Sequence, residues 1–258
     1  MLVLARSASD EDAVPLGRAA SSEITASTGL PAGQTIDDEG LRGRTVYIIR
    51  DEATGQPVGV RKFVSATDPR PGHYIAVQRE ARNYQDIQEA QADWADHILP
   101  FRRAIQRTHG ILLDFDWIHG TDVQTYLEGA SRREAQQALD HAARQLRWLA
   151  LAGYRHGDVK AENIYRTADG RILLFDFDSA SKFINPVSTG TERSRFMAMI
   201  APYVSERTTE RLTAMPFGTK LHEFYLMASR LLRREARPVT YKTRRRSASS
   251  RRRGTRRR

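Results

Sequence analysis

Four polar residues near the middle of the chain, Asp158, Lys160, Asn163 and Asp176, have the types and the spacing that phosphoryl transfer requires. The first three lie within the sequence HGDVKAEN, and Asp176 begins the sequence DFD thirteen residues after Asn163. Transfer of a phosphoryl group to a hydroxyl needs a proton acceptor, a cation beside the moving group and oxygen ligands for Mg²⁺. Two Asp residues, a Lys and an Asn supply these groups, so the pattern predicts a phosphoryl-transfer site.

A Lys and a Glu in the first half of the chain provide a second cation and its partner. Lys62 ends the strand-like sequence VGVRK, and Glu80 follows eighteen residues later in a segment that favours helix. Alternation along a strand places Arg61 on the opposite face from Lys62. Taken alone, a Lys and a Glu at this spacing are more often solvated surface groups. In a chain that also carries the HGD and DFD sequences, they predict an ion pair at the same site.

The segment before residue 118 is predicted to form a small, largely antiparallel sheet with one inserted helix. Thr45–Arg50 and Pro57–Val64 have strand patterns, with a turn between them. The residues from about Ile75 to His97 favour helix. Two further strands are predicted near Ile105 and at Ile111–Trp117.

The segment after residue 118 is predicted to be mainly helical. Ser131 and Glu134 have the spacing of a capping box, and the helix behind them leads directly into the HGD sequence. Asp169–Gly170 is a hairpin turn signal before a short buried strand at Arg171–Phe175. After the DFD sequence, only Leu221–Leu232 has a clear helical pattern.

These motifs resemble those of the protein-kinase-like superfamily over roughly residues 35–235, and most closely a compact serine/threonine protein kinase. The resemblance implies a two-lobed α+β fold, with a β-rich N-lobe that contains one helix and a shortened, mainly helical C-lobe. We expect a mobile leader at residues 1–32 and a kinase-like domain at 33–238. Its N-lobe would span about 33–118 and its C-lobe about 119–238.

The resemblance also implies a role for each residue of the first motif. Asp158 would orient the attacking hydroxyl and accept its proton, and Lys160 would neutralise charge on the moving phosphoryl group. Asn163 and Asp176 would hold Mg²⁺ through oxygen ligands.

ATP is expected between the two lobes. By resemblance, Lys62, positioned by Glu80, would contact the α- and β-phosphates. The sequence LLDFDWIHG resembles the strand and hinge that bind adenine through backbone groups, with the hinge running from Asp116 to Ile118.

Three positions depart from the protein-kinase pattern. The glycine-rich loop that covers the phosphates would lie just before the first strand, where only Gly40 and Gly43 are present. Gly157 stands where many protein kinases have an arginine that pairs with a phosphorylated activation loop. Asp178 stands where the metal-binding motif has a glycine, which predicts a stiffer segment.

Three interpretations of the function remain open. Lys160, two residues after the catalytic Asp, is characteristic of kinases that act on protein hydroxyls, so we favour Ser or Thr of a protein substrate. The combination of HGD with DFD is also the pattern of aminoglycoside- and choline-type small-molecule kinases. Loss of the glycine loop favours a third interpretation, a catalytically inactive pseudokinase scaffold.

The composition of the chain excludes several kinds of site and of protein. The chain has no cysteine, which excludes disulfides and thiolate metal sites, and it has no apolar run of membrane-spanning length. Of its 41 basic residues, ten lie in residues 241–258, and the remainder has 31 basic against 31 acidic residues.

The expected disordered Arg-rich tail at residues 239–258 is therefore a candidate for nuclear import or for binding nucleic acid or another polyanion. We expect an intracellular protein, cytoplasmic or nuclear. Its architecture would suit a viral or effector protein in a host cell.

Overall fold

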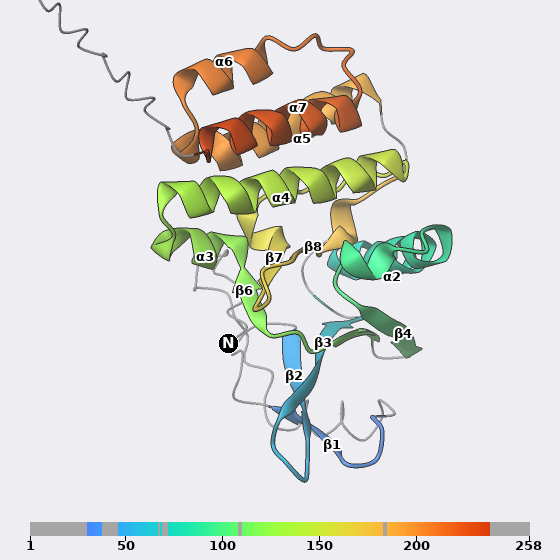
Figure 1. Ribbon diagram of the computed structural model, residues 1–258. Coiled ribbons are helices and arrows are strands. Elements are labelled where there is room, and N and C mark those ends of the chain that lie inside the picture. Colours follow the sequence, from blue (N-terminus) through green and yellow to red (C-terminus); the bar gives the residue numbers. More distant parts are fainter. Residues whose placement is uncertain are drawn as a thin grey trace, which may run out of the picture.

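The computed structural model describes residues 30–37, 46–66, 68, 72–107, 110–182 and 185–237, with the side chains of residues 107 and 186 excepted. Most of the expected leader and all of the Arg-rich tail lie outside these ranges. The described chain forms two lobes (Figure 1): a β-sheet with one helix, and a stack of helices with a small second sheet. This is the two-lobed α+β arrangement that the sequence predicted.

The N-lobe is built on a five-stranded antiparallel sheet in the order β1-β2-β3-β5-β4. The predicted strands are present, and β1 is an addition that the sequence patterns did not indicate. The strands are β1 (Gln34–Asp37), β2 (Val46–Asp51), β3 (Pro57–Ser65), β4 (Phe101–Arg107) and β5 (Gly110–Asp116).

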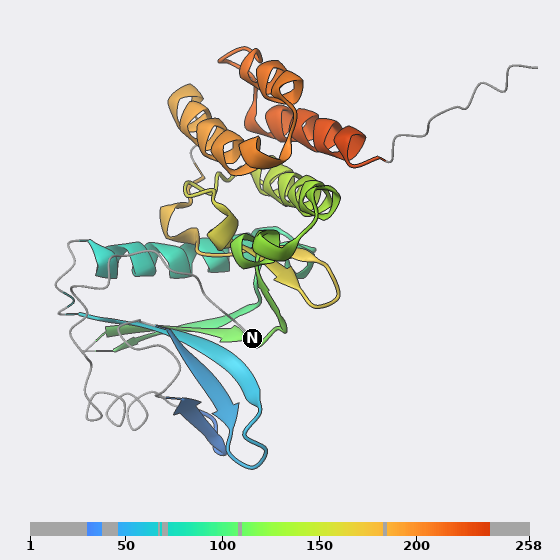
Figure 2. The same cartoon turned by 90° about the vertical axis from the view of Figure 1, so that its left-hand side faces the viewer.

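The N-lobe helix α2 (His73–Ala90) lies between the sheet and the C-lobe (Figure 2). It is anchored by a row of buried apolar residues at helical spacing, Val77, Ala81, Tyr84 and Ile87. The helix is shorter than the sequence predicted. Gln91 adopts an extended conformation that ends α2, and Trp94–Asp96 form a separate short 3₁₀-helix, η1.

A short connection, Trp117–His119, joins the two lobes and leads into a second antiparallel sheet, β6-β7-β8. The predicted hairpin turn is confirmed between β7 and β8, where Gly170 has a positive φ of 89°. The strands are β6 (Gly120–Asp122), β7 (Ile164–Thr167) and β8 (Ile172–Leu174).

The centre of the C-lobe is α4 (Arg132–Leu151), which packs against α7 (Leu221–Glu235). Both bonds of the predicted capping box are present: the Glu134 amide donates to Ser131 Oγ at 3.3 Å, and the Ser131 amide donates to Glu134 Oε2 at 2.9 Å. The cap fixes the start of the helix whose far end delivers the chain to the HGD sequence.

The expectation of a single helix after the DFD sequence was wrong. Two helices precede α7 there, α5 (Pro186–Ile200) and α6 (Glu206–Thr213), while a short α3 (Val123–Gly129) precedes α4. An Asn at the N-cap followed by Pro at the first helical position marked the start of α5 in the sequence.

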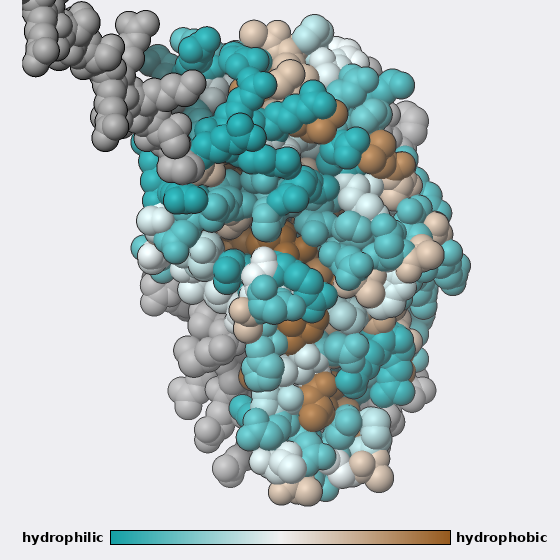
Figure 3. All heavy atoms as spheres, in the orientation of Figure 1, coloured by the Kyte–Doolittle hydropathy of each residue, from teal (hydrophilic) through white to brown (hydrophobic). Residues whose placement is uncertain are grey.

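The surface in the orientation of Figure 1 is mainly hydrophilic, with small hydrophobic patches along the middle of the molecule (Figure 3). None of the helices in the described ranges has the length and apolar character needed to cross a bilayer.

A buried ion pair holds β3 to β5 directly beside the predicted site. The guanidinium of Arg61 is fully buried and makes two bonds to Asp114, at 2.6 and 2.8 Å. The two residues are register partners on the paired strands. Because side chains alternate along a strand, Arg61 lies on the face of β3 that carries this ion pair and Lys62 lies on the opposite face, as the sequence predicted.

Replacing Asp114 with Ala should lower the free energy of unfolding by about 3–5 kcal/mol, because Arg61 would stay buried without its counter-ion. Asp86→Ala is the matched control, since it removes the partner of Lys182 from an exposed pair and should cost less than about 1 kcal/mol. Urea denaturation measures both values. Equal losses in the two variants would contradict the role assigned to the buried pair.

Candidate active site

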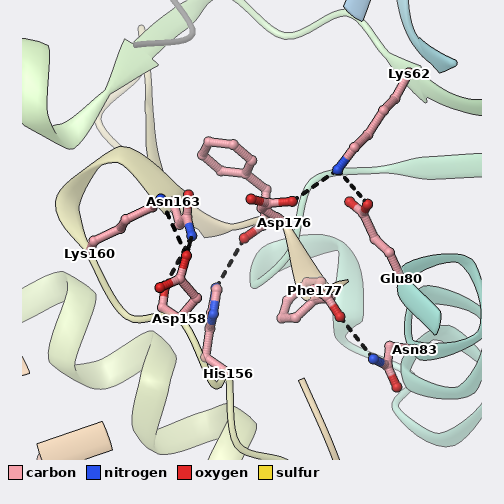
Figure 4. Close-up of polar contacts among 10 residues, drawn as sticks. Lys62, Glu80, Asn83, His156, Asp158, Lys160, Asn163, Asp176 and Phe177 are labelled. Carbon is pink, nitrogen blue, oxygen red and sulfur yellow. Dashed lines mark hydrogen bonds and ion pairs between the residues drawn. The ribbon is translucent and has the colours of Figure 1, made fainter. Parts of the chain in front are cut away.

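Lys62, Glu80 and Asp176 form a double ion pair where the two lobes meet (Figure 4). The Lys62 ammonium lies 2.6 Å from Glu80 Oε2 and 3.0 Å from Asp176 Oδ1. Lys62 comes from β3, Glu80 from the buried face of α2, and Asp176 from the segment that follows β8. Three segments distant in sequence therefore converge on one ammonium group.

The charges of this cluster shift one another's ionisation. Burial opposes the charge on Lys62, but the carboxylates of Glu80 and Asp176 outweigh it and raise the pKa of Lys62 above its usual range. Burial, against the attraction of Lys62, raises the pKa of Glu80 to about 7. Lys62 is therefore a permanent cation at neutral pH, and Asp176 is its more exposed partner.

The loop from Asp158 to Asn163 is closed by a side chain that the sequence assigned to metal binding. Asn163 Nδ2 donates to the Asp158 carbonyl at 3.0 Å and to Asp158 Oδ2 at 2.9 Å. Lys160 Nζ lies 3.3 Å from the same Oδ2, and a guanidinium nitrogen of Arg195 lies 3.2 Å from Oδ1. These three side chains orient the Asp158 carboxylate through both of its oxygens.

Two cations keep Asp158 ionised. Burial opposes its charge, but Lys160 and Arg195 outweigh burial and hold the pKa of Asp158 below its ordinary value. In return, Asp158 raises the pKa of Lys160 against the effect of that residue's own burial. A carboxylate that is ionised at neutral pH can accept a proton from a substrate hydroxyl.

Asp176 has a backbone conformation that its neighbours impose. Its φ of 63° and ψ of 63° make it the one non-glycine residue with positive φ in the described part of the chain. Such a conformation costs about 1–3 kcal/mol and persists where surrounding contacts enforce it. Those contacts include the Nε2–H of His156, which donates to the Phe175 carbonyl at 3.0 Å. Asn83 Nδ2 of α2 donates to the Phe177 carbonyl at 2.8 Å.

Asp178 does not need the backbone freedom of a glycine. It lies in the 3₁₀-turn η3 (Phe177–Ser179) and has no positive φ. An aspartate is therefore compatible with the backbone at this position.

A buried glutamate of α5 supports the loop, and sequence reasoning missed it. Glu192 accepts hydrogen bonds from the amides of His156 and Gly157, at 3.0 and 2.7 Å, and from the Tyr225 hydroxyl at 3.3 Å. Arg195, one helical turn later, donates to the Gly157 carbonyl. Glu and Arg three residues apart share a helix face, but no local pattern indicates that this face meets the loop.

Gly157 is required by the fold at the position where many protein kinases have an arginine. Its φ is 83°, and a Cβ atom at this position would lie 2.0 Å from the Ser179 carbonyl oxygen. Any side chain would collide with the backbone that follows the DFD sequence. The sequence difference is thus a structural necessity of this chain.

The side chains of Asn163 and Asp176 fit a Mg²⁺ ion. Because Asn163 uses its amide nitrogen on Asp158, its carbonyl oxygen is directed elsewhere. Asp176 uses Oδ1 on Lys62, and its second oxygen has no hydrogen bond or ion pair to another residue in the part of the chain that the structure describes. Figure 4 shows Asp176 between the Lys62–Glu80 pair and the group of Asp158 and Asn163. Hard oxygen donors of this kind are what Mg²⁺ prefers.

The predicted hinge residues lie on the connection between the lobes. Asp116 ends β5, and its side chain pairs with Arg102. The carbonyl of Ile118 accepts a hydrogen bond from the Tyr165 hydroxyl at 3.0 Å, which anchors the connection to the C-lobe. Gly40 and Gly43, assigned to the phosphate-covering loop, lie outside the described residues.

No family model and no curated protein sequence matches the chain. Solved structures match in fold. The bifunctional kinase-methyltransferase WbdD matches with a TM-score of 0.54 and 16% identity, over 78% of this chain and 44% of that chain. A co-crystal structure of WbdD with the kinase inhibitor LY294002 matches with a TM-score of 0.56 and 17% identity, over 75% and 44%. The chain spans less than half the length of these neighbours, and at this identity the likeness shows a kinase-like fold.

The geometry at Gly157 predicts a large effect from one methyl group. Gly157→Ala and Gly153→Ala both place Ala at positive φ, which costs about 1–2 kcal/mol. A Cβ atom at Gly153 has no neighbour within 4 Å, whereas one at Gly157 meets the Ser179 carbonyl. Gly157→Ala should therefore lower the free energy of unfolding by about 1–3 kcal/mol more than its control. Urea denaturation of both variants measures this difference, and equal stability would refute the close approach.

Proposed function

We propose that this protein is a kinase that uses Mg²⁺ and ATP to phosphorylate Ser or Thr hydroxyls of a protein substrate. One observation carries the proposal: Asp176, which pairs with Lys62, lies between the Lys62–Glu80 pair and the group of Asp158 and Asn163 (Figure 4). This arrangement brings a permanent cation, an ionised base and oxygen ligands for a metal to one place. The kinase-like fold supports the same conclusion.

Each side chain has a defined task in the reaction. Lys62, fixed by Glu80, binds the α- and β-phosphates of ATP, and Asp116 and Ile118 present backbone groups to adenine. Asp158 accepts the proton of the attacking hydroxyl while Lys160 neutralises charge on the phosphoryl group in transfer. Asn163 and Asp176 hold Mg²⁺, which when bound neutralises negative charge on the phosphates.

The position of Lys160 supports a protein acceptor. Its ammonium lies beside the carboxylate of Asp158, where charge develops during transfer to a hydroxyl. A small-molecule acceptor is the second candidate, and Gly157 favours it because the HGD sequence is shared with aminoglycoside- and choline-type kinases. The chain retains six polar residues in two contacting groups, Lys62 with Glu80 and Asp176, and Asp158 with Lys160 and Asn163. An inactive scaffold has no chemical need for all of them, which argues against that interpretation.

Transfer of label from γ-³²P-ATP with Mg²⁺ tests the proposal. The wild-type protein should label Ser or Thr of an offered acidic or basic protein. Asp158→Asn should reduce transfer at least about a hundredfold, since it removes the proton acceptor. Asp169→Asn changes an exposed residue of the β7–β8 turn in the same way and should retain activity. Label on an aminoglycoside alone would establish a small-molecule acceptor. Full activity of Asp158→Asn would show that Asp158 is not the proton acceptor.

The pH profile of kcat/KM provides a separate prediction. Asp158 must be ionised to act, so activity is present above its pKa and is lost as the pH falls through that value. Arg195 helps to hold this pKa low. Arg195→Gln should therefore move the acidic limb of the profile to higher pH, whereas Arg207→Gln, on the exposed face of α6, should leave it in place. An acidic limb that is unchanged by Arg195→Gln would argue against Asp158 as the titrating base.

A further inference from the structure

A pocket of about 420 Å³ opens beside the proposed catalytic loop, and the reaction described above does not use it. Its walls come from α2, from the residues just before Asp158, from the turn after the DFD sequence and from the first half of α5. Its charged lining residues are all arginines: Arg79, Arg155 and Arg195. No acidic side chain is among the described residues that line it.

Two of the three arginines have no acidic partner among the described residues: Arg79 is exposed, and Arg155 is partly buried. Neither Arg79 nor Arg155 forms an ion pair with any residue that the structure describes. The Nε atom of Arg155 is buried and has no hydrogen-bond partner within the same part of the chain. The Arg155 side chain as a whole is only partly buried and lines the pocket, so its guanidinium charge favours a negatively charged ligand there.

The start of α5 adds to the positive character of the pocket. Asn185, Val187 and Ser188, at its N-terminal end, form part of the lining. The N-terminus of this fifteen-residue helix is the positive end of the helix dipole. The helix dipole therefore adds to the positive potential that the arginines create in the pocket.

Arg195 connects this pocket to the proposed site of transfer. Its guanidinium lies 3.2 Å from Asp158 Oδ1 and donates to the carbonyl of Gly157, itself a lining residue. A ligand bound by Arg195 from the pocket side is therefore adjacent to the carboxylate that receives the substrate hydroxyl. Lys62, in contrast, pairs with Glu80 and Asp176 and does not line the pocket.

We propose that the pocket formed by Arg79, Arg155, Arg195 and the start of α5 binds an anionic group of the acceptor, a phosphate or a carboxylate close to the hydroxyl that is phosphorylated. This inference rests on the proposed function and specifies its substrate: the acceptor segment is acidic or already phosphorylated. Arginines bind both anions through paired N–H donors, with phosphate the stronger ligand because of its higher charge. Cationic acceptors such as aminoglycosides are disfavoured by the same charges.

Two matched pools of acceptor peptides test the inference. Each peptide has one central Ser; the first pool has Asp, Glu or phosphoserine at the flanking positions, and the second has Asn, Gln or Ala there. Wild-type kcat/KM should be at least about tenfold higher for the anionic pool, mainly through a lower KM. Arg155→Gln and Arg79→Gln should each remove most of this preference and leave the rate on the neutral pool unchanged. Arg207→Gln is the matched control and should keep the preference.

Equal use of the two pools by the wild type, or a preference that survives both arginine substitutions, would overturn the inference. Glycerol 3-phosphate and glycerol form a parallel pair of small acceptors. A preference for the phosphate that is confined to this pair and lost in the two variants would support the pocket and reject a protein acceptor.

Direct binding separates failure of the pocket from failure of the proposed function. Fluorescence polarisation of a labelled phosphoserine peptide, without ATP, should show binding that weakens at least about tenfold in Arg155→Gln and Arg79→Gln. If no acceptor is phosphorylated, that result still supports the anion site while the proposed function fails. Binding of equal strength in wild type and both variants would rule the site out.

Discussion

The site depends on the contact of one ammonium group, Lys62 Nζ, with the carboxylates of Glu80 and Asp176. The three residues come from a strand, a helix and the segment after β8, so their charges join the N-lobe to the C-lobe. Loss of the lysine would leave two carboxylates close together in a partly buried space, which is strongly unfavourable. The same helix holds the 3₁₀-turn η3 through Asn83, so α2 contacts the segment after β8 at two places.

A second constraint holds the loop that contains Asp158 through buried contacts of α5. Glu192 accepts from two successive backbone amides, and the small size of Gly157 lets the chain after the DFD sequence pass within contact distance. The orientation of Asp158 therefore follows from buried contacts of α5 and from a steric limit, in addition to the side chains around it. Arg195, on the exposed side of α5, joins this support to the cationic pocket.

Residues whose signal is local could be predicted from the sequence. The capping box at Ser131, the hairpin turn at Gly170 and the alternation around Lys62 each depend on neighbours within a few positions, and the structure confirms them. The roles of Glu192 and Arg195 could not be predicted, because they arise from contacts across more than thirty residues of chain. The helix that carries them was missed because its polar and small residues resemble a loop.

Titration of ATP with and without Mg²⁺ by calorimetry, on the wild type and Asp176→Asn, tests most directly whether these residues form one site for a metal-bound nucleotide. Asn tolerates the left-handed backbone of Asp176, so the variant removes charge with little strain. We expect Mg²⁺ to tighten ATP binding to the wild type at least about tenfold and to have little effect on the variant. Two results would contradict a shared site for Mg²⁺ and ATP: wild-type affinity for ATP that does not depend on Mg²⁺, or an Asp176→Asn variant whose affinity rises with Mg²⁺ as much as that of the wild type.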